Sequence, residues 1–194
     1  MAPTGKHRQS ILAAAAGLFR RQGYAGTGLS EILEASGAPK GSLYHYFPGG
    51  KAEIGAHAVT FAGGLVTGSL EALAKEHQAP GDLLRAYAAQ LADWMAQSAW
   101  QAGCPIATVL LETAPGEATI TAAGAETLAG WSAVFARSLV AAGVPPERAQ
   151  RLAGTTIAAM EGALLLARVQ QSADPILTTA DEIARLLEAA IEEA

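Results

Sequence analysis

The sequence contains no asparagine and only one cysteine, Cys104, among its 194 residues. Without asparagine there is no acceptor for N-glycosylation. A single cysteine excludes an internal disulfide framework, which favours a reducing, cytoplasmic location. Runs of β-branched residues are scarce, whereas alanine and leucine are abundant. This composition predicts an all-α protein of the cytoplasm.

Long uninterrupted apolar segments are also missing. No run approaches the roughly 20 apolar residues of a membrane-spanning helix, and the longest candidate, 157–169, is broken by Glu161 and Arg168. The apolar stretch 11–19 resembles the core of a signal peptide, but an arginine pair follows it at once, which favours a buried first helix. We therefore expect no contact with a membrane.

Charge is distributed unevenly along the chain, whose formal net charge is −5. Residues 1–51 contain six Lys/Arg against two Glu, a net charge of +4, while residues 52–194 contain seven Lys/Arg against sixteen Asp/Glu, a net charge of −9. A basic N-terminal quarter on an acidic body confines contact with a polyanion such as DNA to the first fifty residues.

The segment 27–51, TGLSEILEASGAPKGSLYHYFPGGK, has the pattern of a helix-turn-helix unit. We predict a helix over 29–36, a left-handed turn at Gly37 and a second helix over 40–46, which the following Phe-Pro-Gly-Gly stops. Pro39 fits the first turn of the second helix, because its missing N–H costs nothing there.

The side chains expected to face outwards from the second helix are donors, a cation and aromatic hydroxyls, with no acidic residue among them: Lys40, Ser42, Tyr44, His45 and Tyr46. Ile32, Leu43 and Phe47 should hold the unit together from inside. Thr27 is placed to cap the first helix with its hydroxyl. A helix of this size fits the major groove of B-DNA, and Gly41 would let its backbone approach closely. The alternative is a surface aromatic helix packed on the helix that follows.

The remainder of the chain predicts further helices between Gly and Pro breaks, about nine in all. Helices are expected over 6–22 and 51–78, followed by one that runs from the break at 79–82 to about 102. A short helix should end at 112 and a longer one at Gly143. The last two should span 145–172 and run from a capping box at 179–182 to the end. We expect two domains, 1–50 with the helix-turn-helix and 51–194 as a helical body, joined through a continuous long helix.

Gly23-Tyr24, Thr27, the Gly37 turn and the run at 40–47 with Lys51 beyond it resemble the TetR family of transcriptional repressors. The Gly-Cys-Pro at 103–105 and the Phe-Pro-Gly-Gly-Lys at 47–51 further resemble the LmrA/YxaF-like branch. The resemblance implies a homodimer, a palindromic double-stranded DNA operator, and a pocket in the C-terminal body whose small-molecule inducer releases the DNA.

The resemblance also assigns DNA-binding roles to individual residues. Phosphate contacts fall on Thr27, Tyr46 and Lys51, the major-groove face on Lys40, Gly41, Ser42 and Tyr44, and a backbone contact on His45. Leu33 and Pro39 depart from the family's usual residues, which leaves the operator sequence open.

Gly154, Ala158 and Gly162 recur every four residues, and Leu165 and Val169 continue the same helix face. Small residues in a row let two helices approach closely, as in a four-helix interface between two subunits. With the apolar stripe of the last helix, the expected dimer interface comprises Gly154, Ala158, Gly162, Leu165, Val169, Ile183, Leu187 and Ile191. The alternative is a tight contact within one chain.

Aromatic and long apolar residues at helical spacing form the candidate pocket for a small apolar or aromatic ligand: Phe61, Leu65, Trp94, Met95, Leu110, Trp131, Phe135, Met160, Glu161 and Leu164. Taken singly, each fits an ordinary core equally well. Glu161 would either orient a polar group of the ligand or pair with Arg168.

Motifs of enzymes are not found, so we expect neither catalysis nor a cofactor. There is no His-Glu-x-x-His and no cysteine pair, and the four histidines lack metal-ligand spacing. Cys104 would be a buried structural thiol or a redox sensor, and nothing basic adjoins it in sequence. Two other functions stay open: a small-molecule-binding helical bundle with a non-regulatory role, and an adaptor that binds a different protein through its last two helices.

Overall fold

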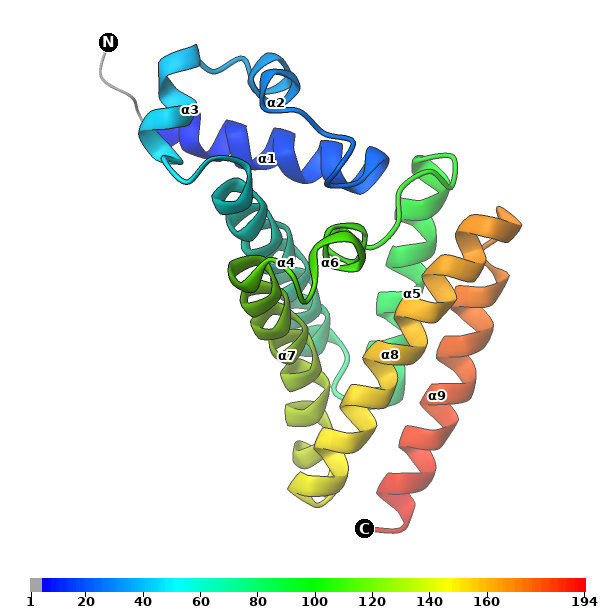
Figure 1. Cartoon of the computed structure of the whole chain (residues 1–194). Helices are drawn as coiled ribbons and strands as arrows, with labels where there is room; N and C mark the ends of the chain where they lie inside the picture. The colour runs from blue at the N-terminus through cyan, green and yellow to red at the C-terminus, as the bar shows by residue number, and fades with distance from the viewer. Residues whose placement is uncertain (1–4) are drawn as a thin grey trace. The chain divides into compact units, whose positions relative to one another are not determined.

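The computed structural model describes residues 5–194, and these form nine α-helices and no β-strand (Figure 1). The helices are α1 Gly5–Gln22, α2 Leu29–Ser36, α3 Lys40–Tyr46, α4 Gly50–Glu76, α5 Pro80–Gln97, α6 Ala107–Thr113, α7 Ala118–Ala141, α8 Pro146–Gln170 and α9 Asp174–Glu192. The predicted fold class is confirmed, and α2 and α3 have the predicted bounds.

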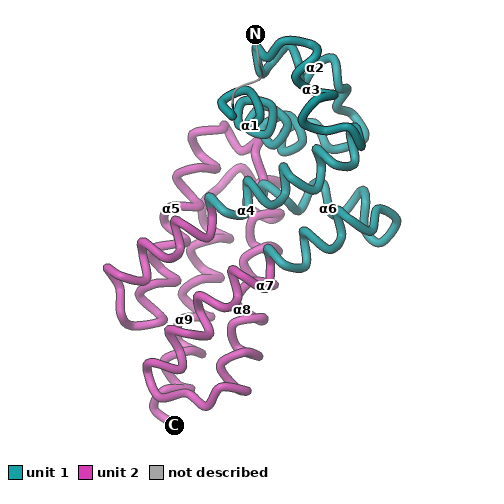
Figure 2. The backbone as a smooth tube through the Cα atoms, turned by 90° about the vertical axis from the view of Figure 1, so that its left-hand side faces the viewer, with its two compact units in different colours: residues 1–65, 104–127 teal, residues 66–103, 128–194 magenta. Residues whose placement is uncertain are grey.

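The described residues divide into two compact units (Figure 2). Unit 1 comprises residues 5–65 and 104–127, and unit 2 comprises residues 66–103 and 128–194. Helices α4 and α7 each contribute to both units, because the unit boundaries fall within them. Helix α6 clusters with the helix-turn-helix rather than with the C-terminal helices.

The core of unit 1 is built on the buried face of α1, which packs against α2 and α3. Ile11 and Phe19 of α1 are fully buried, as are Ile32 of α2, Leu43 of α3 and Phe47 just after it. The last three are the residues expected to hold the helix-turn-helix together, and the structure confirms that role. Burial of side chains of this size is worth about 1.5–3 kcal/mol each.

Two glycines let α4 pass close to α7 within unit 1. A Cβ at Gly55 would lie 2.8 Å from Ile120 and 2.9 Å from the Tyr24 ring, and a Cβ at Gly63 would overlap Thr127. Both glycines are therefore required by close packing, and neither has a left-handed backbone that would require glycine for conformational reasons.

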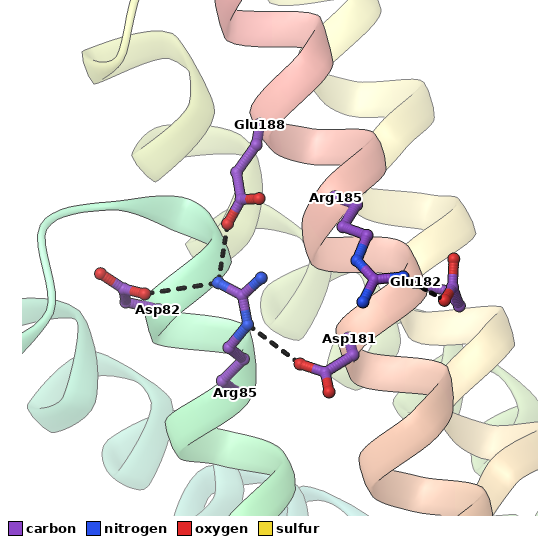
Figure 3. Close-up of polar contacts among 6 residues, drawn as sticks. All are labelled: Asp82, Arg85, Asp181, Glu182, Arg185 and Glu188. Atoms are coloured by element: carbon purple, nitrogen blue, oxygen red, sulfur yellow. Dashed lines mark hydrogen bonds and ion pairs between the residues drawn. The ribbon is translucent and has the colours of Figure 1, made fainter.

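Unit 2 is a bundle in which α9 packs against α5 and α8. The α5–α9 contact carries an exposed ion-pair cluster centred on Arg85 (Figure 3). Its guanidinium lies 3.0 Å from Asp181 and 2.7 Å from Glu188 of α9, and 3.4 Å from Asp82 of its own helix. Hydrogen bonds to Glu188 and Asp181 raise the pKa of Arg85 above its usual value. Gly81 adjoins the cluster, because a Cβ there would lie 2.6 Å from Glu188.

Two predicted helix ends are wrong. Helix α5 ends at Gln97 rather than near residue 102, because Ala99 and Trp100 turn the chain with φ values of 50° and 63°. The hydroxyl of Ser98 donates to Met95 O at 2.8 Å and accepts from the N–H of Ala102 at 3.1 Å, which stabilises that turn.

The last helix begins at Asp174, five residues before the predicted capping box, which lies inside it. Pro175 occupies the first turn, where a proline leaves no hydrogen bond unmade. The Ser172 hydroxyl also accepts the Asp174 N–H at 3.1 Å, so the helix start is satisfied there.

Among the described helices, α8 is long and apolar enough to cross a membrane by length and composition alone. This is weak evidence, because helices in the cores of soluble proteins pass the same test. An apolar α8 is equally suited to a helix–helix interface between protein chains.

Candidate DNA-binding site

The turn between α2 and α3 is set by Gly37, whose φ of 61° is left-handed as predicted. Its N–H donates to Glu34 O at 3.2 Å and closes α2. Pro39, expected in the first turn of α3, instead stands at its N-cap, one residue earlier, with a φ of −58°. At the other end the Phe47 N–H donates to Leu43 O at 2.8 Å. The seven-residue α3 is therefore fixed at both ends by the residues that predicted it.

Helix α3 presents Lys40, Gly41, Tyr44 and His45 to solvent, and Tyr44 is 57% exposed. No carboxylate lies among them, so a phosphate backbone would meet a cation and hydrogen-bond donors without repulsion. A Cβ at Gly41 would have no atom within 4 Å. The fold itself does not require glycine at this position, which agrees with a need for close approach by a partner outside the chain.

Two of the residues expected to face outwards do not do so fully. Ser42 is 6% exposed, so the expectation that it faces outwards is wrong, and a groove contact by its hydroxyl stays a prediction. Tyr46 is half-buried, with its ring edge-on to His45 at 5.1 Å and 6.4 Å from the Phe47 ring. The seven-residue helix turns these two positions towards the core that Leu43 and Phe47 fill.

Thr27 does not cap α2 and does not present its hydroxyl to solvent. It is 1% exposed and donates to Gly23 O at 2.7 Å, so it stabilises the turn after α1. The N-cap is Gly28, whose N–H points to the Glu31 carboxylate at 3.5 Å. The prediction that Thr27 caps α2 is therefore wrong, whereas a phosphate contact at Thr27 stays a prediction.

Lys51 is the second residue of α4, and its side chain folds back onto the turn after α1. Its Nζ lies 4.5 Å from the centre of the Tyr24 ring and 3.4 Å from Ala25 O. Burial, with a smaller contribution from Glu117, raises the pKa of Tyr24, so the ring stays a neutral phenol. Contact of Lys51 with a phosphate would require release of these two interactions and remains a prediction.

Two residues outside the predicted set, Arg8 and Glu31, also shape the site. The Arg8 guanidinium lies 5.7 Å from the Phe47 ring, and its Nη2 is 3.4 Å from His57 Nδ1, which joins α1 to the end of α3 and the start of α4. Glu31 accepts from Gln22 Nε2 at 2.8 and 2.9 Å. Glu31 stands three residues after Gly28, the spacing of a capping box, so a local sequence signal for its role exists. Nothing in the sequence predicts the contact between Arg8 and His57.

The predicted dimer face on α8 lies open in the protomer. Gly154, Ala158 and Gly162 are exposed, Leu165 is 64% exposed and Val169 is 73% exposed. A Cβ at either glycine would have no atom within 4 Å. The alternative of a tight contact within the chain is therefore wrong for this row.

The α9 part of the expected interface needs a correction. Leu187 is fully buried, so it belongs to the core of the protomer, and Ile183 and Ile191 are half-buried. Leu177 and Leu186, which are 41% and 43% exposed, are the large apolar residues that α9 presents to solvent. The interface assignment of Leu187 is therefore wrong, while that of Ile183 and Ile191 stays a prediction.

The ten residues of the predicted pocket are divided between the two units. Five of them are buried in unit 2: Met95, Trp131, Phe135, Met160 and Leu164. The Phe135 ring lies edge-on to Tyr87, with 6.4 Å between the ring centres. Trp94 and Glu161 are half-buried in the same unit. Phe61 and Leu110 are half-buried in unit 1. Leu65 is instead 64% exposed, unlike a residue that lines an enclosed pocket.

Unit 2 also has two open grooves. One, of about 710 Å³, runs along α4 and α7, and the other, of about 660 Å³, runs along α7 and α8. None of the ten predicted residues lines either groove. The lining of a ligand pocket therefore remains a prediction from sequence.

Comparison with known proteins decides the family. Residues 11–58 match the model of bacterial regulatory proteins of the tetR family, and residues 80–192 match the C-terminal domain of LmrA/YxaF-like transcriptional regulators. The chain belongs to the TetR family. The first match contains most of α1 together with α2 and α3, and the second contains α5 to α9, so both parts of a TetR-family regulator are present.

Individual relatives agree along nearly the whole chain. The chain is 35% identical to the uncharacterized HTH-type transcriptional regulator YxaF of Bacillus subtilis, over 94% of this chain and 96% of the relative. It is 31% identical to the HTH-type transcriptional regulator LmrA of the same organism, over 94% and 97%. The crystal structure of regulatory protein TetR from Rhodobacter sphaeroides superposes with a TM-score of 0.80 at 27% identity, covering 92% of this chain and 97% of that one.

These relatives identify the chain as a transcriptional regulator with a helix-turn-helix DNA-binding domain. The predicted LmrA/YxaF-like branch is confirmed by the C-terminal match. In this TetR-family chain the α3 surface formed by Lys40, Gly41, Tyr44 and His45 is therefore the candidate recognition surface.

Proposed function

We propose that this TetR-family chain is a cytoplasmic repressor that binds a palindromic operator as a homodimer and releases it when a small molecule binds its C-terminal domain. The observation that carries the proposal is the exposed face of α3. It presents a cation, a backbone without a Cβ and two aromatic donors, on a helix fixed at both ends. A single helix with three or four such side chains is what the major groove accommodates.

The dimer is supported by the apolar residues that α8 and α9 leave exposed. Leu165, Leu166 and Val169 of α8 are 51–73% exposed, and Leu177 and Leu186 of α9 are 41% and 43% exposed. Large apolar side chains exposed on two helices that pack together favour a protein–protein contact. Two-fold symmetry of the dimer would be matched by an operator with two half-sites, whose typical spacing is one turn of DNA, about 34–36 Å, or slightly more.

The inducer would be a small apolar or aromatic molecule, because most of the predicted pocket residues are aromatic or long aliphatic side chains. If the ligand lowers the affinity of the protein for its operator, linkage requires that the operator lowers the affinity of the protein for the ligand by the same factor. Coupling of about 1–3 kcal/mol is typical for such systems. Unequal factors at equilibrium would exclude a simple two-state release.

Selection of DNA fragments from the organism's own genome by the purified protein tests the proposal. We expect recovered fragments to share an inverted repeat and to lower the output of a reporter promoter when the protein is co-expressed. An increase in reporter output would indicate an activator. Recovery of random fragments that bind no better than bulk DNA would instead favour the alternative, a small-molecule-binding helical bundle with a non-regulatory role.

A further inference from the structure

The carboxylate of Glu112 on α6 is bound to the turn that follows α1, 87 and 88 residues earlier in the chain. Its Oε2 accepts the Ala25 N–H at 2.6 Å, and its Oε1 accepts the Tyr24 N–H at 3.2 Å. Both oxygens are thus used, one for each of two consecutive backbone donors. The preceding Gly23 makes room for this contact, because a Cβ there would overlap the carboxylate.

Helix stability does not explain a carboxylate at this place. Glu112 lies in the last turn of α6, and the two N–H groups that it binds follow the last turn of α1. Both helices direct the negative end of their dipole there, which disfavours an anion at each end. The two charge-assisted hydrogen bonds are the interactions that favour glutamate at this position.

The turn that Glu112 holds leads directly into the helix-turn-helix. Thr27 closes the turn from inside by donating to Gly23 O, and Lys51 of α4 contacts Ala25 O and the Tyr24 ring. Helix α2 begins two residues after Thr27. The position of α2, and through it of α3, therefore depends on a turn that α6 holds from outside the helix-turn-helix.

We propose that Glu112 is a positioning residue for DNA binding, which ties the α1–α2 turn to α6 so that the two move together. The proposal rests on the DNA-binding function inferred above for α3. It does not require Glu112 to touch DNA. Removal of the carboxylate leaves the helices intact but frees the turn, and a freed turn presents α3 in a wider range of orientations, which weakens binding.

Hydrogen–deuterium exchange on Glu112→Gln tests the tie without any DNA. Glutamine has nearly the same shape but only one acceptor oxygen, so at least one of the two N–H groups loses its partner. We expect exchange of the Tyr24 and Ala25 amides to become about threefold to tenfold faster, the low end reflecting solvent screening of an exposed contact. Glu126→Gln removes the same charge from an exposed site on α7 and should leave these amides unchanged. Equal exchange in Glu112→Gln and the wild type would overturn the proposal.

Binding to a DNA fragment selected from a random pool by the wild type measures the consequence. The proposal predicts that Glu112→Gln weakens binding about threefold to tenfold, and that DNA slows amide exchange in α6 of the wild type but not of this variant. If Glu112→Gln binds this DNA with unchanged affinity and DNA still slows amide exchange in α6 of the variant, the positioning role is contradicted. Failure of the wild type to select any DNA is a different result, which would refute the proposed function itself, while the exchange at Tyr24 and Ala25 would still decide whether the tie exists.

Discussion

Replacement of Leu165 by alanine tests whether the apolar surface of α8 is where two protomers meet. Full burial of a leucine side chain is worth about 1.5–3 kcal/mol. Leu165 is 64% exposed in the protomer, so its burial in a dimer would contribute about two-thirds of that value, ~1–2 kcal/mol per protomer. Two-fold symmetry counts the residue twice, which gives ~2–4 kcal/mol and a dimer dissociation constant raised ~30- to ~700-fold.

Sedimentation velocity over a concentration series measures this change directly, and circular dichroism confirms that the variant folds. Leu111→Ala is the matched control, because Leu111 of α6 is 85% exposed and lies outside the proposed interface. We expect Leu165→Ala to dissociate at concentrations where the wild type and Leu111→Ala are dimeric. A dimer unchanged by Leu165→Ala, or weakened equally by both substitutions, would refute the assignment of this surface.

Three further substitutions test other parts of the account. Gly41→Ala should raise the free energy of unfolding by about 0.5–1 kcal/mol and weaken DNA binding. Its control, Gly64→Ala, lies at an exposed glycine of α4 with equally free space and should give the same gain in stability while binding DNA normally. Equal DNA binding by both variants would show that close approach at α3 is not needed. Gly63→Ala, next to that control, should lower stability by about 1–3 kcal/mol because its Cβ overlaps Thr127, and thermal unfolding that matches Gly64→Ala would contradict the tight α4–α7 crossing. Arg85→Ala should cost a few tenths to about 1 kcal/mol in urea unfolding at low salt, a loss that shrinks at high salt; a salt-independent loss would mean that packing rather than charge is responsible.

The parts of the fold that could be predicted from sequence are those set by local signals. Gly37 and the Phe-Pro-Gly-Gly that follows α3 act through their own backbone preferences, so both bounds of α3 were correct. The row Gly154, Ala158 and Gly162 likewise has a fixed helical spacing, which showed that the three residues share a face.

What could not be predicted depends on contacts between distant segments or on competition between two local signals. The Thr27 hydroxyl had a plausible local partner in α2, but in the folded chain it donates to Gly23 O. The start of α9 was placed at a capping box although Pro175 provides an earlier start that costs nothing. The tie between Glu112 and the α1–α2 turn spans 87 residues, and no periodicity or spacing in the sequence reports it.

The most direct test of the central claim, that α3 is the DNA-recognition surface, is fluorescence anisotropy with Lys40→Ala and Lys75→Ala on a fragment selected by the wild type. Both lysines are exposed and each substitution removes one positive charge, but only Lys40 lies on α3. Because a major-groove contact is worth about 1–3 kcal/mol, Lys40→Ala should weaken binding about 5- to 140-fold, while Lys75→Ala binds like the wild type. Equal affinity of the two variants for this fragment would contradict the claim.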